Sequence, residues 1–343
     1  MADTTIKNME EFASVSGISR PTLSKYFNNP ESVRKSTRAK IEAALEQYAY
    51  RPNVYAVNQN RRHTKNIGLI VPNLTDPFFG AIARVIEGII IHNGFTPLLL
   101  SSHAGPEGEL ENLKNLISLK PAGILLAPLG RASRQDDIAE LCRGIPTVLF
   151  DANLTDVGEA FVGSDNGKSI SLMVDYLCRS GEPPIFFEMK DPINPNALKR
   201  RDAYTRAMEA IGHTPNLIQV EGDSWDFEKI GFEGASDLFE QDKITSNTIL
   251  CSNDRIAIGV LSAAYQKGLK VGHAPGCHFR VAGHDDHPYA KYTCPALTTV
   301  SQDYEEIAKS AVSSLLTTIE AEDDERNKTQ KLFTGRLILR DSA

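Results

Sequence analysis

The sequence predicts two kinds of structure in one chain: a small all-α module, followed by a large α/β body made of two subdomains. Three observations lead to this prediction. Residues 5 to 66 show helical periodicity, whereas the following residues alternate short apolar runs with amphipathic stretches. The net charge also changes sign, from +5 up to Lys65 to −12 beyond it. A basic module joined to an acidic body indicates that only the first part meets a polyanion.

The bulk properties are those of an ordinary globular protein. A length of 343 residues suits two or three domains, and 41% hydrophobic and 24% charged residues are typical values. No apolar run reaches the roughly 18 residues that span a bilayer, and the N-terminus lacks a signal-peptide pattern. The five cysteines form no CxxC pair. They predict reduced thiols in a cytoplasmic protein rather than disulfides or a zinc site.

The basic module is predicted to contain three helices. Asn8 and Glu11 have capping-box spacing, so a first helix is expected over about 8–15. Gly17 supplies a turn, and Ser19 can cap a second helix that runs to about Asn28. A third helix is expected at about 35–49. The outer face of the second helix carries two cations, two hydroxyls and a phenol, namely Arg20, Lys25, Thr22, Ser24 and Tyr26.

Such side chains reach base edges and phosphates in a major groove. The first turn of the third helix adds Arg34, Lys35, Arg38 and Lys40, which suit phosphate contacts. A solvated basic bundle is the alternative interpretation. The order of helix, glycine turn, capped helix with a polar face, and third helix favours DNA binding.

The body is predicted to be a βαβ repeat. Its strands are expected in the runs NIGLIVP, TPLLLSS, AGILLAP, TVLFD, AFVGSD, PIFFEM, LIQVEG, TILCSND and RVAGHD. Helices are expected at 79–94, 107–119, 166–180, 197–212, 228–240 and 255–268. This alternation predicts parallel sheets with helices on both faces, and the number of strands predicts two subdomains. A ligand is expected in the cleft at the carboxyl ends of the strands.

Motifs of catalysis are absent from the sequence. It contains no GxGxxG, no GxxxxGK[ST] and no GxSxG, so we predict neither an enzyme nor a cofactor. The run His284-Asp285-Asp286-His287 matches no closed zinc pattern, and a polar loop at a strand end is the favoured interpretation.

The segment ISRPTLSKYFNNPESVRKSTRAKIEAALEQYAYRPN resembles the DNA-binding headpiece of the LacI/GalR family of bacterial repressors. By that resemblance, Arg20, Pro21 and Lys25 read the operator, and a hinge that includes Ala56 and Gln59 meets the minor groove. The residues implied to hold phosphates are Ser19, Thr22, Ser24, Asn28, Thr37 and Asn53. Two departures stand out: Pro21 has no hydrogen-bonding side chain, and Gln59 replaces the leucine that members of the family wedge between base pairs.

The body also resembles the effector domain of this family over nearly its whole length. Similar segments are Asp76-Pro77-Phe78-Phe79, Asp165-Asn166, Arg200 four residues before Tyr204, Ser252-Asn253-Asp254, Gly283-His284-Asp285-Asp286 and Leu297-Thr298-Thr299-Val300. The resemblance implies an effector site that includes Phe78 and Phe79. It also implies an aromatic ring stacked on the ligand. Trp225 is the first candidate for this ring, and Phe227 is a rival because the local spacing is off by about one residue.

Four polar residues at predicted strand ends or first helical turns point to the same cleft, namely Asp165, Arg200, Asn253 and Asp285. Acceptors, an amide and a bidentate donor suit a polyhydroxylated ligand, so a mono- or disaccharide is expected. Structural roles are the alternatives. The two aspartates could cap helices, Arg200 could form a surface ion pair, and Trp225 could be a core residue.

The expected organisation is a headpiece (1–52), a hinge (53–65) and an effector domain (66–343). The first subdomain is expected at about 66–162 plus 294–325, and the second at about 163–293 plus 326–343. We expect a homodimeric, sugar-responsive repressor that binds a near-palindromic DNA operator, since a leucine-heptad tetramerisation helix would need more chain. The alternatives are a solute receptor of the same two-lobed fold and an enzyme such as a sugar kinase.

Overall fold

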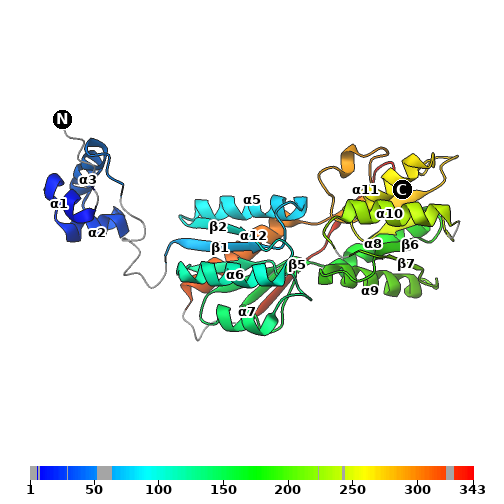
Figure 1. Cartoon of the computed structure of the whole chain (residues 1–343), viewed down its shortest axis with the longest axis horizontal. Helices are drawn as coiled ribbons and strands as arrows, with labels where there is room; N and C mark the ends of the chain where they lie inside the picture. The colour runs from blue at the N-terminus through cyan, green and yellow to red at the C-terminus, as the bar shows by residue number, and fades with distance from the viewer. Residues whose placement is uncertain are drawn as a thin grey trace. The chain divides into compact units, whose positions relative to one another are not determined.

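The computed structural model describes residues 6, 8–28, 30–51, 64–222, 224–241, 244–321 and 328–343. The chain divides into two compact units, Met1–Thr64 and Lys65–Ala343 (Figure 1). Within the described ranges, no helix is both long enough and apolar enough to cross a membrane.

The first unit is a three-helix module. It consists of α1 (Met9–Ser16), α2 (Arg20–Asn28), the 3-10 turn η1 (Pro30–Ser32) and α3 (Lys35–Gln47). One residue from each helix, Phe12, Leu23 and Ile41, is fully buried in its core. The side chain of Asn8 caps α1 by accepting the backbone N–H of Glu11 at 2.9 Å. The helices are therefore fixed by a shared apolar core, as the sequence predicted.

The first lobe of the second unit is built on a six-stranded parallel sheet in the order β11-β5-β4-β3-β1-β2. The strands are β1 (Asn66–Val71), β2 (Thr96–Ser101), β3 (Gly123–Leu126), β4 (Thr147–Phe150), β5 (Ala160–Ser164) and β11 (Thr329–Phe333). Apolar residues of α5 (Pro77–His92) and α12 (Tyr304–Glu320) pack on one face. Those of α6 (Pro106–Ser118) and α7 (Gln135–Cys142) pack on the other.

The second lobe repeats this plan on a four-stranded parallel sheet in the order β7-β6-β8-β9. The strands are β6 (Ile185–Met189), β7 (Leu217–Val220), β8 (Thr248–Cys251) and β9 (Arg280–Ala282). Helices α8 (Asn166–Ser180) and α9 (Pro195–Ala210) cover one face. Helices α10 (Phe227–Glu240) and α11 (Asp254–Gln266) cover the other. The predicted fold class, parallel sheets with helices on both faces, is confirmed.

One part of the predicted subdomain division is wrong. Residues 326–343 were assigned to the second subdomain, but Thr329–Phe333 forms β11 and pairs in parallel with β5 at the edge of the first sheet. This strand is polar and largely exposed, so it lacks the apolar run that marks a strand in sequence. The chain then returns through β12 (Arg336–Ile338), which pairs antiparallel with β10 (Thr299–Ser301).

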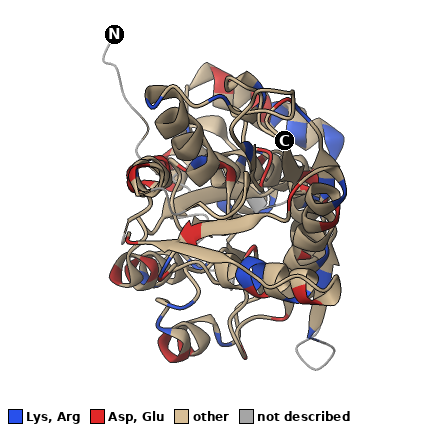
Figure 2. Cartoon of the chain, turned by 90° about the vertical axis from the view of Figure 1, so that its right-hand side faces the viewer, with Lys and Arg blue, Asp and Glu red and all other residues tan. Residues whose placement is uncertain are grey.

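Figure 2 shows that Lys, Arg, Asp and Glu lie mainly on helices and loops, while the strands are mostly uncharged. The burial pattern agrees, since every residue of β3, β4 and β8 is buried. A strand buried on both faces is mostly apolar, because an unpaired charge there would lose its hydration. Glu188 of β6 is a buried exception, and its carboxylate is paired with Arg201.

Candidate functional site

The exposed face of α2 carries the side chains that were predicted to meet DNA. Arg20, Pro21 and Lys25 are exposed, and the hydroxyls of Ser19 and Thr22 lie 2.8 Å apart. Ser24 and Thr37 are half-buried. The predicted contacts Asn53, Ala56 and Gln59, and the side chain of Asn28, lie outside the described residues.

Two of the basic side chains in this module are paired with carboxylates. Arg20 donates to Glu10 of α1 at 2.9 Å, and Arg38 forms a two-bond pair with Glu31. Among the predicted phosphate contacts, Arg34, Lys35 and Lys40 are exposed. Some basic side chains of this face can therefore bind a polyanion directly, whereas others must first break an ion pair with a carboxylate of the module.

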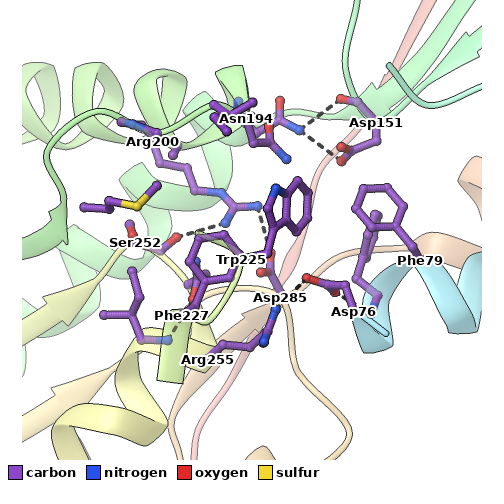
Figure 3. A pocket seen from close by; sticks show the side chains of 18 of the residues that line it. Asp76, Phe79, Asp151, Asn194, Arg200, Trp225, Phe227, Ser252, Arg255 and Asp285 are labelled. Atoms are coloured by element: carbon purple, nitrogen blue, oxygen red, sulfur yellow. Dashed lines mark hydrogen bonds and ion pairs between the residues drawn. The ribbon is translucent and has the colours of Figure 1, made fainter. Parts of the chain in front are cut away.

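A pocket between the two lobes of the second unit gathers most of the predicted effector residues. We call it the effector pocket. Its lining includes six predicted residues, namely Phe78, Phe79, Arg200, Trp225, Asn253 and Asp285. Phe227, the rival to Trp225, lines it as well (Figure 3).

Arg200 is fixed by three hydrogen bonds in the wall of the pocket. Its side chain donates to Asn166 Oδ1 at 2.8 Å, to the Ser252 carbonyl at 2.9 Å and to Asp285 Oδ1 at 2.7 Å. The residue is only 6% exposed. Since the guanidinium has five N–H donors, two remain for a ligand. The surface ion pair considered from the sequence is therefore wrong, because Arg200 is buried.

Asp285 is the acceptor at the centre of this arrangement. Its Oδ1 also accepts from Gln302 Nε2 at 2.7 Å and contacts His284 Nδ1 at 2.9 Å. Burial alone would raise the pKa of Asp285, but the charge of Arg200 and the hydrogen bonds lower it to about 2. The carboxylate is therefore ionised at neutral pH. Its backbone has φ 120°, a conformation that is unfavourable for a non-glycine residue and that occurs at functional sites.

Asp151 is a site residue that the sequence analysis missed. It follows β4, and its Oδ1 accepts from Asn196 Nδ2 of the other lobe at 2.9 Å. Its Oδ2 is buried and has no hydrogen-bond partner in the described part of the chain. Burial raises its pKa to about 7. The sequence does contain a signal for this residue, because Asp151 ends the run TVLFD and therefore lies at a strand end, as the predicted effector residues do.

Aromatic rings form the apolar side of the pocket. The Trp225 ring centroid lies 6.1 Å from that of Phe79 and 5.7 Å from that of Phe227. In Figure 3, Trp225 stands at the centre of the pocket among the polar side chains. Phe227 is instead covered by the Arg255 guanidinium, 5.1 Å from its centroid. Trp225 is therefore the better placed of the two to stack on a ligand.

A salt bridge that the sequence did not predict also links the two lobes. Arg255 of α11 donates to Asp76 Oδ2 at 3.1 Å, and Asp76 also caps α5 by accepting the Phe78 N–H at 3.0 Å. Glu228 holds the same guanidinium with bonds of 2.7 and 2.6 Å. Because both Asp76 and Arg255 line the effector pocket, the pair is part of its wall.

Asp165 is the predicted effector residue that does not line this pocket. It caps α8, accepting the Lys168 N–H at 3.0 Å, and its carboxylate lies 3.2 Å from Lys168 Nζ. The following residue, Asn166, contacts Arg200 instead. The structure thus gives Asp165 the helix-capping role that was the alternative. No group of three or more potential metal ligands occurs within the described ranges.

Comparisons with known proteins identify relatives of both units of the chain. Residues 8–53 match the model of bacterial regulatory proteins of the lacI family, and residues 174–343 match that of the periplasmic binding protein-like domain. The transcriptional regulator reg1 of Streptomyces lividans is 28% identical, with 90% of this chain and 89% of that protein covered. The ribose operon repressor of Escherichia coli K12 is 26% identical, with 90% and 92% covered.

A similar solved structure is that of a Lac repressor dimer bound to operator and the anti-inducer ONPF. It superposes with a TM-score of 0.83 at 22% identity, covering 98% of both chains. At this identity the likeness concerns the fold. Both units of the chain therefore have counterparts of known architecture.

Proposed function

Because this chain belongs to the LacI family of bacterial regulatory proteins, we propose that it is a transcriptional repressor whose operator affinity is changed by a small sugar in the effector pocket. The observation that carries the sugar assignment is the convergence of Arg200, Asp285 and Trp225 on one cleft between two lobes. The ribose operon repressor, which is similar over 92% of its length, is named for a sugar operon.

The chemistry of the pocket suits hydroxyl groups on a ring. Ionised Asp285 accepts hydrogen bonds, and the unused N–H groups of Arg200 donate them. Asn253 uses its Oδ1 to cap α11, so its amide N–H groups are available as donors. Trp225 offers a flat face for the apolar side of a pyranose or furanose.

Operator binding is assigned to the first unit. Arg20 and Lys25 are placed on the exposed face of α2, where side chains can reach base edges in the major groove. Ser19, Thr22 and Thr37, together with exposed lysines and arginines, would contact phosphates. A regulator that binds chromosomal DNA acts in the cytoplasm.

The active form is proposed to be a homodimer. Large exposed apolar side chains occur on both lobes, including Ile91 of α5, Leu99 of the edge strand β2 and Tyr265 of α11. Exposed aromatic residues of this size are enriched at protein interfaces. Two copies related by a two-fold axis would present two headpieces to a near-palindromic operator.

The proposed switch is a coupling between the lobes and DNA affinity. Contacts such as Asn196–Asp151 and Arg255–Asp76 join the lobes beside the pocket, so a ligand that alters their relative position changes these bonds. Ligand and operator then influence each other's affinity by the same factor. Release from DNA by the sugar is the proposed direction.

The test uses the full chain. An operator is selected from genomic DNA by footprinting, and its affinity is measured by mobility shift across a panel of sugars. One sugar is expected to weaken operator binding at least about tenfold, a coupling of roughly 1.4 kcal/mol. A chain that lacks residues 1–64 should still bind this sugar but not the DNA. Sugar binding with no retention of DNA by the full chain would instead indicate a solute receptor.

A further inference from the structure

A second cavity lies next to the effector pocket and shares a wall with it. Four residues line both spaces, namely Asp76, Phe78, Arg255 and Asp285. The second cavity has about 850 Å³ of unoccupied space, open solvent included. It extends toward His287, Lys291 and Tyr304. The shared residues show that a thin partition, rather than a layer of core, separates the two spaces.

The ion pair between Arg255 and Asp76 is the part of this partition that joins the two lobes. The two side chains come from different lobes, and both are well buried, with 15% and 11% of their side-chain surface exposed. Arg255 is held from three sides, by Asp76, by two bonds to Glu228 and by the ring of Phe227. A charge-assisted pair that is shielded from water does not open freely, because each charge would be left unpaired.

The second cavity has hydrogen-bonding groups of its own. The Nδ1 atom of His287 accepts the Tyr289 N–H at 3.1 Å, so the neutral ring carries its proton on Nε2. That N–H is buried and has no hydrogen-bond partner within the residues that the structure describes. His287 itself is 7% exposed. A buried donor without an acceptor is costly, so it would gain from an oxygen that reaches it once the wall beside it opens.

We propose that the Arg255–Asp76 pair sets the size of the effector. While the pair is intact, the effector pocket admits a single sugar ring, and the partition excludes the second ring of a glycoside. Removing the pair joins the two spaces. The second ring then enters the second cavity, where the Nε2–H of His287 donates to one of its oxygens. This inference rests on the proposed sugar-binding function and names the ligand class more narrowly, as a monosaccharide.

The test is isothermal titration calorimetry of the full chain with matched sugars. Each monosaccharide is paired with a disaccharide that contains it, for example glucose with maltose or sucrose, and galactose with lactose or melibiose. The native chain should bind one monosaccharide at least about tenfold more tightly than its paired disaccharides. In Arg255→Ala this ratio should shift toward the disaccharide by about tenfold or more, a change of roughly 1.4 kcal/mol.

Three further variants make the result specific. Lys267→Ala removes a paired cation that directly follows α11, is held by Glu240 at 2.5 Å and lines neither cavity, and it should leave the ratio unchanged. Asp76→Asn keeps an oxygen to cap α5 but removes the charge, so it should shift the ratio in the same direction as Arg255→Ala. Adding His287→Phe to Arg255→Ala should reverse the gain for the disaccharide, since the donor is lost.

Two results would overturn the inference. One is equal binding of monosaccharide and disaccharide by the native chain. The other is an unchanged ratio in both Arg255→Ala and Asp76→Asn while the monosaccharide still binds. If the native chain bound DNA but no sugar at all, the sugar assignment of the proposed function would fail, and the size limit with it.

Discussion

The guanidinium of Arg20 lies 2.9 Å from the carboxylate of Glu10, so the first residue of α2 is paired with α1. Both side chains are exposed, with 64% and 71% of their surface accessible. An exposed pair contributes at most about 1 kcal/mol, so DNA can compete for the arginine. On DNA that offers Arg20 no matching base, however, the carboxylate of Glu10 repels the phosphates.

Replacing Glu10 by glutamine is therefore expected to raise affinity for random DNA about two- to fivefold, a change of roughly 0.4–1 kcal/mol. Operator affinity should rise less, because Arg20 already leaves Glu10 when it binds a base. Fluorescence anisotropy with operator and scrambled duplexes would measure both. Glu46→Gln makes the same charge change on α3 and serves as the control. A larger gain for operator than for random DNA would contradict this role.

Trp225 should report ligand binding directly, because it is the only tryptophan of the chain. A sugar that stacks on its ring is expected to change its fluorescence intensity or emission maximum during a titration. Trp225→Ala should weaken sugar binding at least about tenfold, since an aromatic stacking partner is worth on the order of 1 kcal/mol in addition to its buried area. Phe227→Leu should have a smaller effect, because Arg255 covers that ring. The reverse order would identify Phe227 as the stacking residue.

Asp151 predicts a pH dependence of stability. Its pKa is raised in the folded protein to about 7, so the charged form is disfavoured by folding. Its contribution to stability is complete below about pH 4 and is lost as the pH rises through about 7. The unliganded protein should therefore melt at a lower temperature at pH 8.5 than at pH 5.5.

Asp151→Asn retains an oxygen that can accept from Asn196 and removes the ionisation. It should raise the melting temperature at pH 8.5 by at least about 2 °C, measured by calorimetry. Burial also raises the pKa of Asp254 to about 7, so this residue contributes a pH dependence of the same sign. The decrease of melting temperature with pH should therefore be smaller in Asp151→Asn but not absent. An identical pH profile for native and variant protein would show that Asp151 does not titrate in this range.

Tyr265 tests the proposed homodimer. This residue of α11 is 82% exposed, and exposed aromatic residues are enriched at protein interfaces. Tyr265→Glu is expected to weaken self-association and lower the mass observed by light scattering at micromolar concentration. Leu172→Glu on α8, which is 44% exposed in the native chain, makes a similar change on another helix and should leave the mass unchanged. A native chain that is monomeric would exclude the proposal.

Much of the fold was predictable because buried parallel strands require continuous apolar runs, and amphipathic helices separate them. Those rules located β1 through β9 without structural information. They did not predict the three-residue strands β10 and β12. They also failed for β11, whose residues are polar because the strand lies at an exposed sheet edge, where pairing with β5 supplies the order. Local sequence carries no signal for such pairing between distant segments.

The site residues that could be predicted are those next to a recognisable strand end or helix start. Arg200, Asn253 and Asp285 follow strands or begin helices, and they meet in the pocket as expected. Asp165 satisfies the same rule but turns toward its own helix, because a carboxylate at that position can cap the first turn. The Arg255–Asp76 pair was missed because its members lie 179 residues apart in sequence and meet only through the packing of the two lobes.

The bonds of Asp285 have a consequence for changing the specificity of this regulator. The carboxylate of Asp285, which lines the effector pocket, is bonded to Gln302, which in turn is bonded to Ser164 where the chain crosses between the lobes. A substitution at Asp285 would therefore disturb the hydrogen bonds of the segment that connects the two lobes, and would also change which ligand is bound. Trp225 contacts the pocket without such bonds. New ligand preferences should thus be easier to select at Trp225, and variants at Asp285 should tend to lose their response altogether.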